Sequence, residues 1–160
     1  MEERNIRICE HPAVDNILSG YAKIAEQKEI LIAWDVTLSK KLPIRDLDLI
    51  AILGNAMENA IHGCEKAKAE TKQIHVLIRQ TKQSVSVRIE NTCPQTVFFS
   101  EGLPVRKTGG GIGVGSIMAS VRKYHGSVQF SADGGSFVVE LKLPLDRCAG
   151  AQNTERRKEK

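Results

Sequence analysis

Five glycines fall within seven consecutive positions, 109–115, in the stretch KTGGGIGVGSI. Glycine tolerates positive φ angles and lacks the Cβ that would keep a ligand away from the backbone. Apolar residues recur at helical spacing directly afterwards: Val114, Ile117, Met118, Val121 and Tyr124. The stretch therefore predicts a turn that leads into a helix and presents backbone N–H groups to an anion, typically a phosphate. A merely flexible loop is the alternative.

The rest of the chain alternates between helical and β patterning. Helical spacing of apolar residues predicts helices over 11–29 and 47–67, in addition to the one that ends near Tyr124. Period-two or β-rich patterning predicts strands over 30–38, 74–80, 84–91, 127–131 and 137–145, with Asp133-Gly134 as a hairpin turn between the last two. The segment from Thr92 to Gly111 shows no periodicity and is predicted to be a long loop, which is typical of a binding segment.

This order of elements, α-β-α-β-β-loop-α-β-β, predicts an α/β sandwich in which helices cover one face of a mixed sheet. A Rossmann domain is not favoured, because its glycine fingerprint follows the first strand of a βαβ unit. The helix over 47–67 is expected to bury one apolar stripe. The stripe comprises Leu47, Ile50, Gly54, Met57, Ile61 and Cys64.

Composition excludes several classes of protein. The 160 residues indicate one domain, and 23 Lys+Arg against 19 Asp+Glu give a net charge of +4, of which the last ten residues supply +2. The nearly neutral body does not indicate a nucleic-acid surface. Four cysteines without a CxxC pair indicate free thiols in a reducing compartment. No apolar run approaches the ~20 residues that span a bilayer, so we expect a cytoplasmic chain without membrane contact.

The helix over 47–67 also carries a polar face. At 100° per residue, Asn55, Asn59 and His62 fall within an arc of roughly 60°, away from the apolar stripe. Surface helices often carry such faces, but asparagine is a mediocre helix former. An amide oxygen is a suitable ligand for Mg²⁺, which takes its other ligands from water and phosphate. Together with the glycine turn, this face suggests a Mg-nucleotide site.

Taken together, these motifs resemble a known family. LGNAMENAIHG resembles the N box of the GHKL superfamily of ATP-binding domains, and GGGIGVGSI resembles its second glycine box. IEN, the loop EGLPVRKTGGG, YHGSVQF and a closing F-x-V-x-L-x-LP are similar to the ATP-binding domain of sensor histidine kinases, particularly the peptide-pheromone quorum-sensing type. The resemblance implies the Bergerat α/β sandwich over residues 11–146, after a lead-in of residues 1–10 and before a disordered charged tail, 147–160.

The resemblance also assigns roles to residues. Asn59 matches the Mg²⁺ ligand, and Asn55 matches the catalytic position beside the phosphates where ATPase members place a general-base glutamate. His62 stands where a basic residue faces phosphate, and Asn91 replaces the aspartate that accepts a hydrogen bond from the adenine amino group. Residues Thr92 to Gly110 correspond to a mobile lid. The remaining cofactor-binding residues implied are Lys107, Thr108, Gly109, Gly110, Gly111, Ile112, Gly113 and Val114.

The implied chemistry is transfer of the γ-phosphoryl group of ATP, with Mg²⁺, to a histidine. That histidine would belong to an upstream dimerisation domain absent from this chain, and a response regulator would follow as partner, which makes the chain the cytoplasmic portion of a membrane-bound receptor. His11 is expected to be structural or exposed. Two alternatives remain, namely a serine kinase of the anti-sigma-factor type and a degenerate GHKL binding module. Asn91 counts against the former, and Glu58 lies about 60° from Asn55 around the helix.

Overall fold

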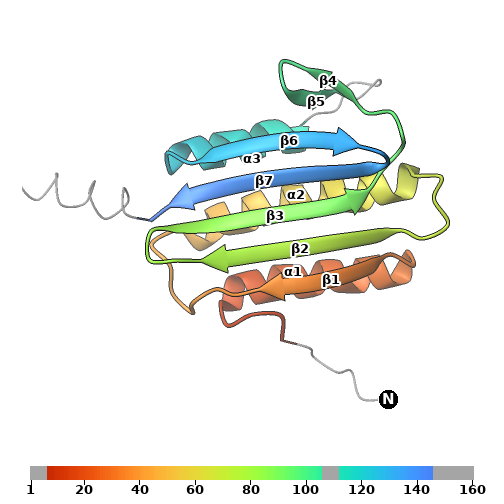
Figure 1. The fold of residues 1–160 in the computed structure, drawn as a ribbon. Coiled ribbons are helices and arrows are strands. Elements are labelled where there is room, and N and C mark those ends of the chain that lie inside the picture. The colour runs from red at the N-terminus through yellow and green to blue at the C-terminus, as the bar shows by residue number, and fades with distance from the viewer. Residues whose placement is uncertain (1–6, 106–111, 146–160) are drawn as a thin grey trace, which may run out of the picture.

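The computed structural model describes residues 7–105 and 112–145, which form two layers. A five-stranded sheet makes one layer, and three helices cover one of its faces (Figure 1). The described elements are α1 (Pro12–Gln27), β1 (Leu31–Val36), α2 (Asp46–Lys66), β2 (Gln73–Gln80), β3 (Ser84–Thr92), β4 (Phe98–Ser100), β5 (Leu103–Val105), α3 (Ile112–Lys123), β6 (Ser127–Asp133) and β7 (Ser136–Pro144). The predicted α/β sandwich with helices on one face is confirmed.

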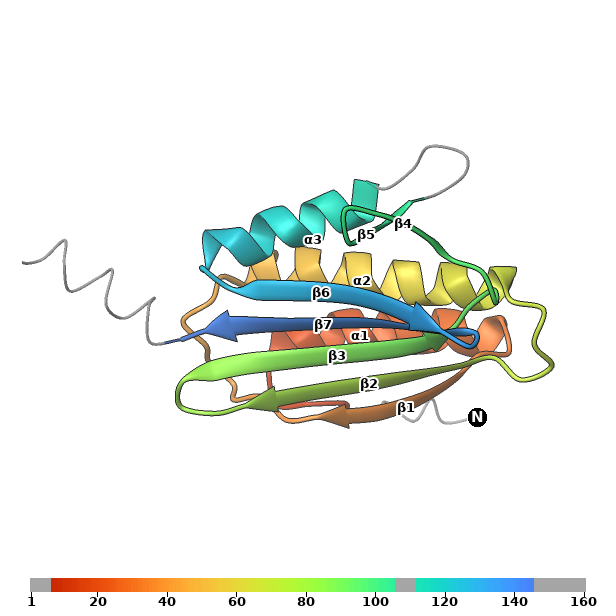
Figure 2. The same cartoon turned by 45° about the horizontal axis from the view of Figure 1, so that its top comes forward.

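The sheet is mixed and mostly antiparallel, as predicted. Its strand order is β1-β2-β3-β7-β6, and β1 and β2 are parallel while the other neighbours are antiparallel. The parallel pair is joined through α2, which is the crossover connection that parallel strands require. Figure 2 shows α1, α2 and α3 on the same side of the sheet. The opposite face carries ion pairs such as Arg79 with Asp35 at 2.6 Å.

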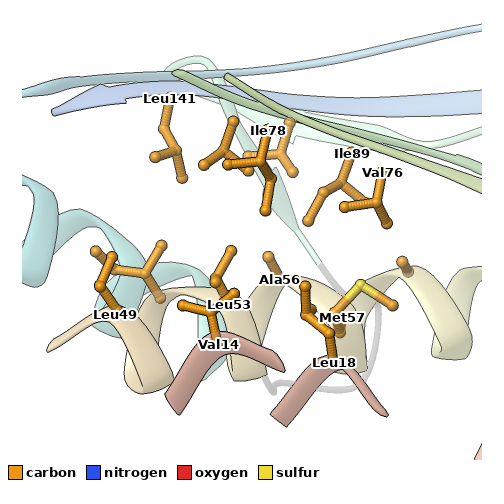
Figure 3. Close-up of a cluster of buried hydrophobic side chains, with 14 of the residues drawn as sticks. Val14, Leu18, Leu49, Leu53, Ala56, Met57, Val76, Ile78, Ile89 and Leu141 are labelled. Atoms are coloured by element: carbon orange, nitrogen blue, oxygen red, sulfur yellow. The ribbon is translucent and has the colours of Figure 1, made fainter. Parts of the chain in front are cut away.

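The core lies between the inner face of the sheet and the helices (Figure 3). Alternate residues of β2 point inward, so Val76 and Ile78 are fully buried against Leu53 and Met57 of α2. Burying one such side chain contributes about 1.5–3 kcal/mol. Helix α1 packs beside α2 at Gly54, where a Cβ would lie 3.3 Å from Ile17 Cδ1. The central position of α2, between α1 and α3 and over the sheet, explains why residues on much of its circumference are buried.

The predicted stripe on α2 is partly wrong. Leu47 is 70% exposed because it lies in the first turn, at the margin of the buried arc. That arc is wider than a single stripe, since α2 contacts the sheet, α1 and α3 together. The buried residues of α2 are Leu49, Ile52, Leu53, Gly54, Ala56, Met57, Ala60, Ile61 and Cys64.

Two connections differ from their predictions. The segment predicted as a long loop contains the short hairpin β4–β5, whose turn residues Glu101 and Gly102 have φ of 52° and 78°. Strands of three residues are too short to show a period. In the β6–β7 hairpin, the two turn residues are Gly134 and Gly135, with φ of 58° and 84°, rather than Asp133-Gly134. Two consecutive positive φ angles are typical of a type I′ turn.

His11 is structural, which was one of the two predicted outcomes. Its side chain is 2% exposed, and its Nδ1 accepts a hydrogen bond of 3.3 Å from Val14 N at the start of α1. Its Nε2 lies 3.6 Å from Asp46 Oδ1, at the first residue of α2. Pro12 follows as the first residue of α1, a position where its missing N–H costs nothing. His11 thus ties the starts of α1 and α2 together.

Candidate functional site

The polar face of α2 lies beside the start of α3. Asn55 and Asn59, one turn apart, are both half-buried. A Cβ on Gly113, the second residue of α3, would lie 3.4 Å from both amide atoms of Asn59 and 3.6 Å from Asn55 Oδ1. Glycine therefore allows the backbone at the start of α3 to approach both amides closely. The structure thus brings together one predicted glycine residue and two predicted residues of α2, although the two segments lie far apart in sequence.

The two amides differ in their hydrogen bonds. Asn55 Nδ2 donates to the carbonyl of Ala51 within the same helix at 2.7 Å. Among the described residues, no hydrogen bond to the Asn59 side chain is found. Asn55 is therefore partly committed to its own helix, whereas Asn59 has both amide atoms available for a ligand.

Glu58 is the carboxylate nearest in sequence to Asn55 and Asn59, and it is held on the other side of α2. Tyr21 of α1 donates a hydrogen bond of 3.1 Å from its hydroxyl to Glu58 Oε1. Burial and the hydrogen bond to Glu58 raise the pKa of Tyr21 to about 12. Glu58 therefore faces α1, and it does not take the place of a general base beside Asn55.

Asn91 lies at the end of β3 and is 3% exposed. Its side chain packs over Gly63 of α2, and its Nδ2 donates to the carbonyl of Thr92 at 2.9 Å. Gly63 is one turn beyond Asn59, so Asn91 lies further along the same helix than the contact with Gly113. Sequence reasoning missed Gly63; the signal was a glycine inside a helix, which is unfavourable without a packing reason.

The other predicted residues are distributed as follows. His62 is on α2 and is exposed. Val114 is 8% exposed and packs inward from α3, so only its backbone could meet a phosphate. Ile112 begins α3. The predicted residues Lys107, Thr108, Gly109, Gly110 and Gly111 lie outside the described residues.

The β4–β5 hairpin contacts the end of the sheet. The ring of Phe99 lies parallel to that of Phe137 on β7, with centroids 6.4 Å apart, and Phe137 is 6.3 Å from Phe130. At the start of the segment, Cys93 N donates to the carbonyl of Gly135 at 2.8 Å. These contacts join the predicted lid to the β6–β7 hairpin.

A hollow of about 550 Å³ lies at one end of the sheet, along the starts of β1, β2 and β7 and the end of β3. Its lining includes His75, Glu90, Asn91 and Ser136 but neither Asn59 nor Gly113. Ser136 Oγ and Arg88 hold the pKa of Glu90 below its usual value through hydrogen bonds. This hollow therefore shares Asn91 with the candidate nucleotide site but does not extend to Asn59 or Gly113.

The part of the chain that the structure describes contains neither a metal-ligating cluster nor a membrane-spanning helix. In residues 7–105 and 112–145, no three His, Cys, Asp or Glu side chains gather where they could hold a metal ion. A Mg²⁺ ion held by one asparagine, phosphate oxygens and water needs no such cluster.

Within the same residues, none of the helices has the length and apolar character to cross a bilayer. Cys9, Cys64 and Cys93 are free thiols, and burial raises the pKa of Cys64 to about 11.

Comparison with known proteins identifies the family of the chain. A family model described as GHKL domain matches residues 44–144, which is more than half of the chain. The chain therefore belongs to the GHKL domain family. It is 27% identical over 149 residues to the probable C4-dicarboxylate sensor kinase of Bacillus subtilis (strain 168), covering 84% of this chain and 28% of the relative. It is 24% identical over 125 residues to sensor protein PhoQ of Escherichia coli O157:H7, covering 73% and 24%.

Solved structures show the same fold. The catalytic domain of histidine kinase ThkA superposes with a TM-score of 0.65 at 15% identity, covering 84% of this chain and 90% of that one. Histidine kinase AdeS of Acinetobacter baumannii gives 0.64 at 17% identity, covering 84% and 64%. The predicted GHKL family is thus confirmed, and the curated relatives that the chain resembles are sensor kinases. The chain spans about a quarter of the length of the curated relatives it matches.

Proposed function

We propose that this domain binds Mg-ATP between α2 and α3. The observation that carries the proposal is the approach of Gly113 to Asn59, at 3.4 Å from a Cβ position to the amide. That approach puts free backbone N–H groups at a helix start next to an amide oxygen, and these are the two kinds of group that a magnesium-bound phosphate needs. Asn91 would accept a hydrogen bond from the adenine amino group at the other end of the site.

The residues present fit the cofactor. Asn59 has no competing hydrogen bond among the described residues and would act as the Mg²⁺ ligand, while Asn55 would donate its second amide N–H to the phosphates. His62 lies one turn beyond Asn59 on α2 and is exposed, so its side chain would donate a hydrogen bond to phosphate. Residues 107–114 would complete the phosphate turn. When bound, Mg²⁺ would neutralise charge on the phosphate oxygens.

We also propose that the γ-phosphoryl acceptor is a histidine of a dimerisation domain outside these 160 residues. His11 is unsuitable because it is buried and its Nδ1 accepts the hydrogen bond at the start of α1. Water is a poor substitute, since Asn55 cannot act as a general base and Glu58 is held by Tyr21. A response regulator would take the phosphoryl group next, by analogy with the sensor kinases to which the chain is similar.

The wider setting follows from the same relatives. We infer that residues 11–146 are the nucleotide-binding domain and that 1–10 and 147–160 flank it. The domain would work as the cytoplasmic portion of a membrane-bound receptor, and its motifs favour the peptide-pheromone type.

Calorimetric titration tests the binding proposal. The chain should bind ATP more tightly with Mg²⁺ than with a chelator, and more tightly than Mg-GTP. Thermal unfolding with and without millimolar Mg-ATP gives an independent readout, because a ligand that binds only the native state raises its stability. No heat and no stabilisation at millimolar nucleotide would instead support a degenerate binding module.

A further inference from the structure

Asn91 is the polar exception in an apolar row. Its neighbours across the sheet are Ile74 on β2 and Phe137 on β7, and the inward residues that precede it on β3 are Val85, Val87 and Ile89. A buried amide is unfavourable unless its hydrogen-bonding groups are used. An asparagine at this position therefore needs a reason that packing does not supply.

The amide of Asn91 has one orientation. Its Nδ2 donates to the carbonyl of Thr92 at 2.9 Å, and only the nitrogen of an amide can donate to a carbonyl. Among the described residues, no hydrogen bond is found that ends on Oδ1. The oxygen is therefore the group that remains for a ligand, and it can only accept.

Gly63 makes this orientation possible. A Cβ at this position would overlap Asn91 Nδ2 and would lie 3.6 Å from Asn91 Cγ and 3.5 Å from the Thr92 carbonyl oxygen. Any side chain on Gly63 would thus push the amide away from α2. Gly63 lies in the last turn of α2, where alanine would be the better helix former, so the close approach of Asn91 supplies a packing reason for the glycine.

We propose that Gly63 is a positioning residue for base recognition. It leaves the space in which Thr92 holds the Asn91 amide with Oδ1 as the free acceptor, so the site selects adenine, whose 6-amino group donates, over guanine, whose 6-oxygen can only accept. The proposal rests on the nucleotide-binding function proposed above and adds the determinant of base choice. It also implies that a carboxylate cannot replace this asparagine, because an ionised Asp has no donor for the Thr92 carbonyl.

The first experiment compares Gly63→Ala with Gly20→Ala by calorimetry, using Mg-ATP and Mg-GTP. Gly20 is the matched control, because it is also a helical glycine and a Cβ there meets nothing within 4 Å. Gly63→Ala should weaken ATP binding about tenfold, the effect of one lost hydrogen bond, and should bring the ATP-to-GTP affinity ratio towards one. Gly20→Ala should change neither value.

The second experiment uses Asn91→Asp and does not depend on the folding of Gly63→Ala. We expect it to bind Mg-ATP about tenfold more weakly than the unmodified chain, because the carboxylate and the Thr92 carbonyl repel each other. Equal or tighter ATP binding would overturn the proposal. Nuclear magnetic resonance of the side-chain amide gives a readout without nucleotide: one Asn91 N–H proton should exchange slowly in the unmodified chain and quickly in Gly63→Ala.

The outcomes separate the two proposals. If the unmodified chain binds neither nucleotide, both the proposed function and the base selection are overturned. If it binds ATP but Gly63→Ala keeps the same ATP-to-GTP ratio and the same slow amide proton, only the role of Gly63 is overturned.

Discussion

Replacing Asn59 by alanine should weaken Mg-nucleotide binding much more than replacing Asn55. Asn59 has no competing hydrogen bond among the described residues, so its removal takes away a whole charge-assisted contact of about 1.5–3 kcal/mol. That corresponds to about ten- to a hundredfold in affinity. Asn55 already donates to the Ala51 carbonyl at 2.7 Å, and its loss should cost about 0.5–1.5 kcal/mol.

Calorimetry with Mg-ADP on both variants measures this difference, and thermal unfolding without nucleotide is the control. Both substitutions place a better helix former in α2, so neither should lower stability greatly. Asn59→Asp adds a sharper test, because a carboxylate keeps an oxygen ligand for Mg²⁺ but repels phosphate when the metal is chelated. Its binding should therefore depend more steeply on Mg²⁺ than that of the unmodified chain. A larger loss for Asn55→Ala than for Asn59→Ala would refute the placement of the metal.

Three further predictions concern the contacts that hold the site in place. Tyr124 donates to Asp48 and, with Lys123, holds the pKa of that carboxyl below its usual value, so Tyr124→Phe should cost about 1.5–3 kcal/mol at neutral pH. A carboxyl with a lowered pKa stabilises the fold at pH values above its usual pKa of 3.8, and this stabilisation is lost as the pH falls. The difference in unfolding free energy between the unmodified chain and Tyr124→Phe, measured in urea, should therefore shrink below about pH 4. Tyr21 should ionise near pH 12 in an ultraviolet titration, and Glu58→Gln should lower the pKa of Tyr21. Because the pKa of Tyr21 is raised on folding, the contribution of this tyrosine to stability is complete below about pH 10 and is lost as the pH rises towards 12. Phe99→Ala should speed amide exchange in β4–β5 but not in β3 or β7, and slow exchange throughout the unmodified hairpin would contradict its assignment to a mobile lid.

Much of the fold follows from local patterning. The period-two runs of β2 and β3 and the helical stripes of α1 and α3 are long enough to identify element type and order. The β4–β5 hairpin could not be predicted, because three-residue strands carry no period. The exposure of Leu47 was missed since a helical wheel does not show where neighbouring helices end.

The site was predictable only in part. Helical spacing alone gathers Asn55 and Asn59 on one face, but their meeting with Gly113 depends on how α3 packs against α2, which the family resemblance supplied. The contact between Gly63 and Asn91 joins a helix to the end of a strand, and no local pattern encodes it. The hydrogen bond from Tyr21 to Glu58 joins α1 to α2, and nothing in the local sequence of either helix indicates it.

Transfer of radiolabelled γ-phosphate tests the central claim most directly. The chain alone should leave the label in ATP, because phosphoryl transfer requires an oriented nucleophile and orientation supplies roughly 7 to 11 kcal/mol of the barrier. Adding a matching histidine-bearing dimerisation segment should produce acid-labile label on that segment, and Asn59→Ala should abolish it. Acid-stable label on a serine or threonine of an added partner would indicate a serine kinase instead, and rapid labelling of His11 would contradict the account of the acceptor.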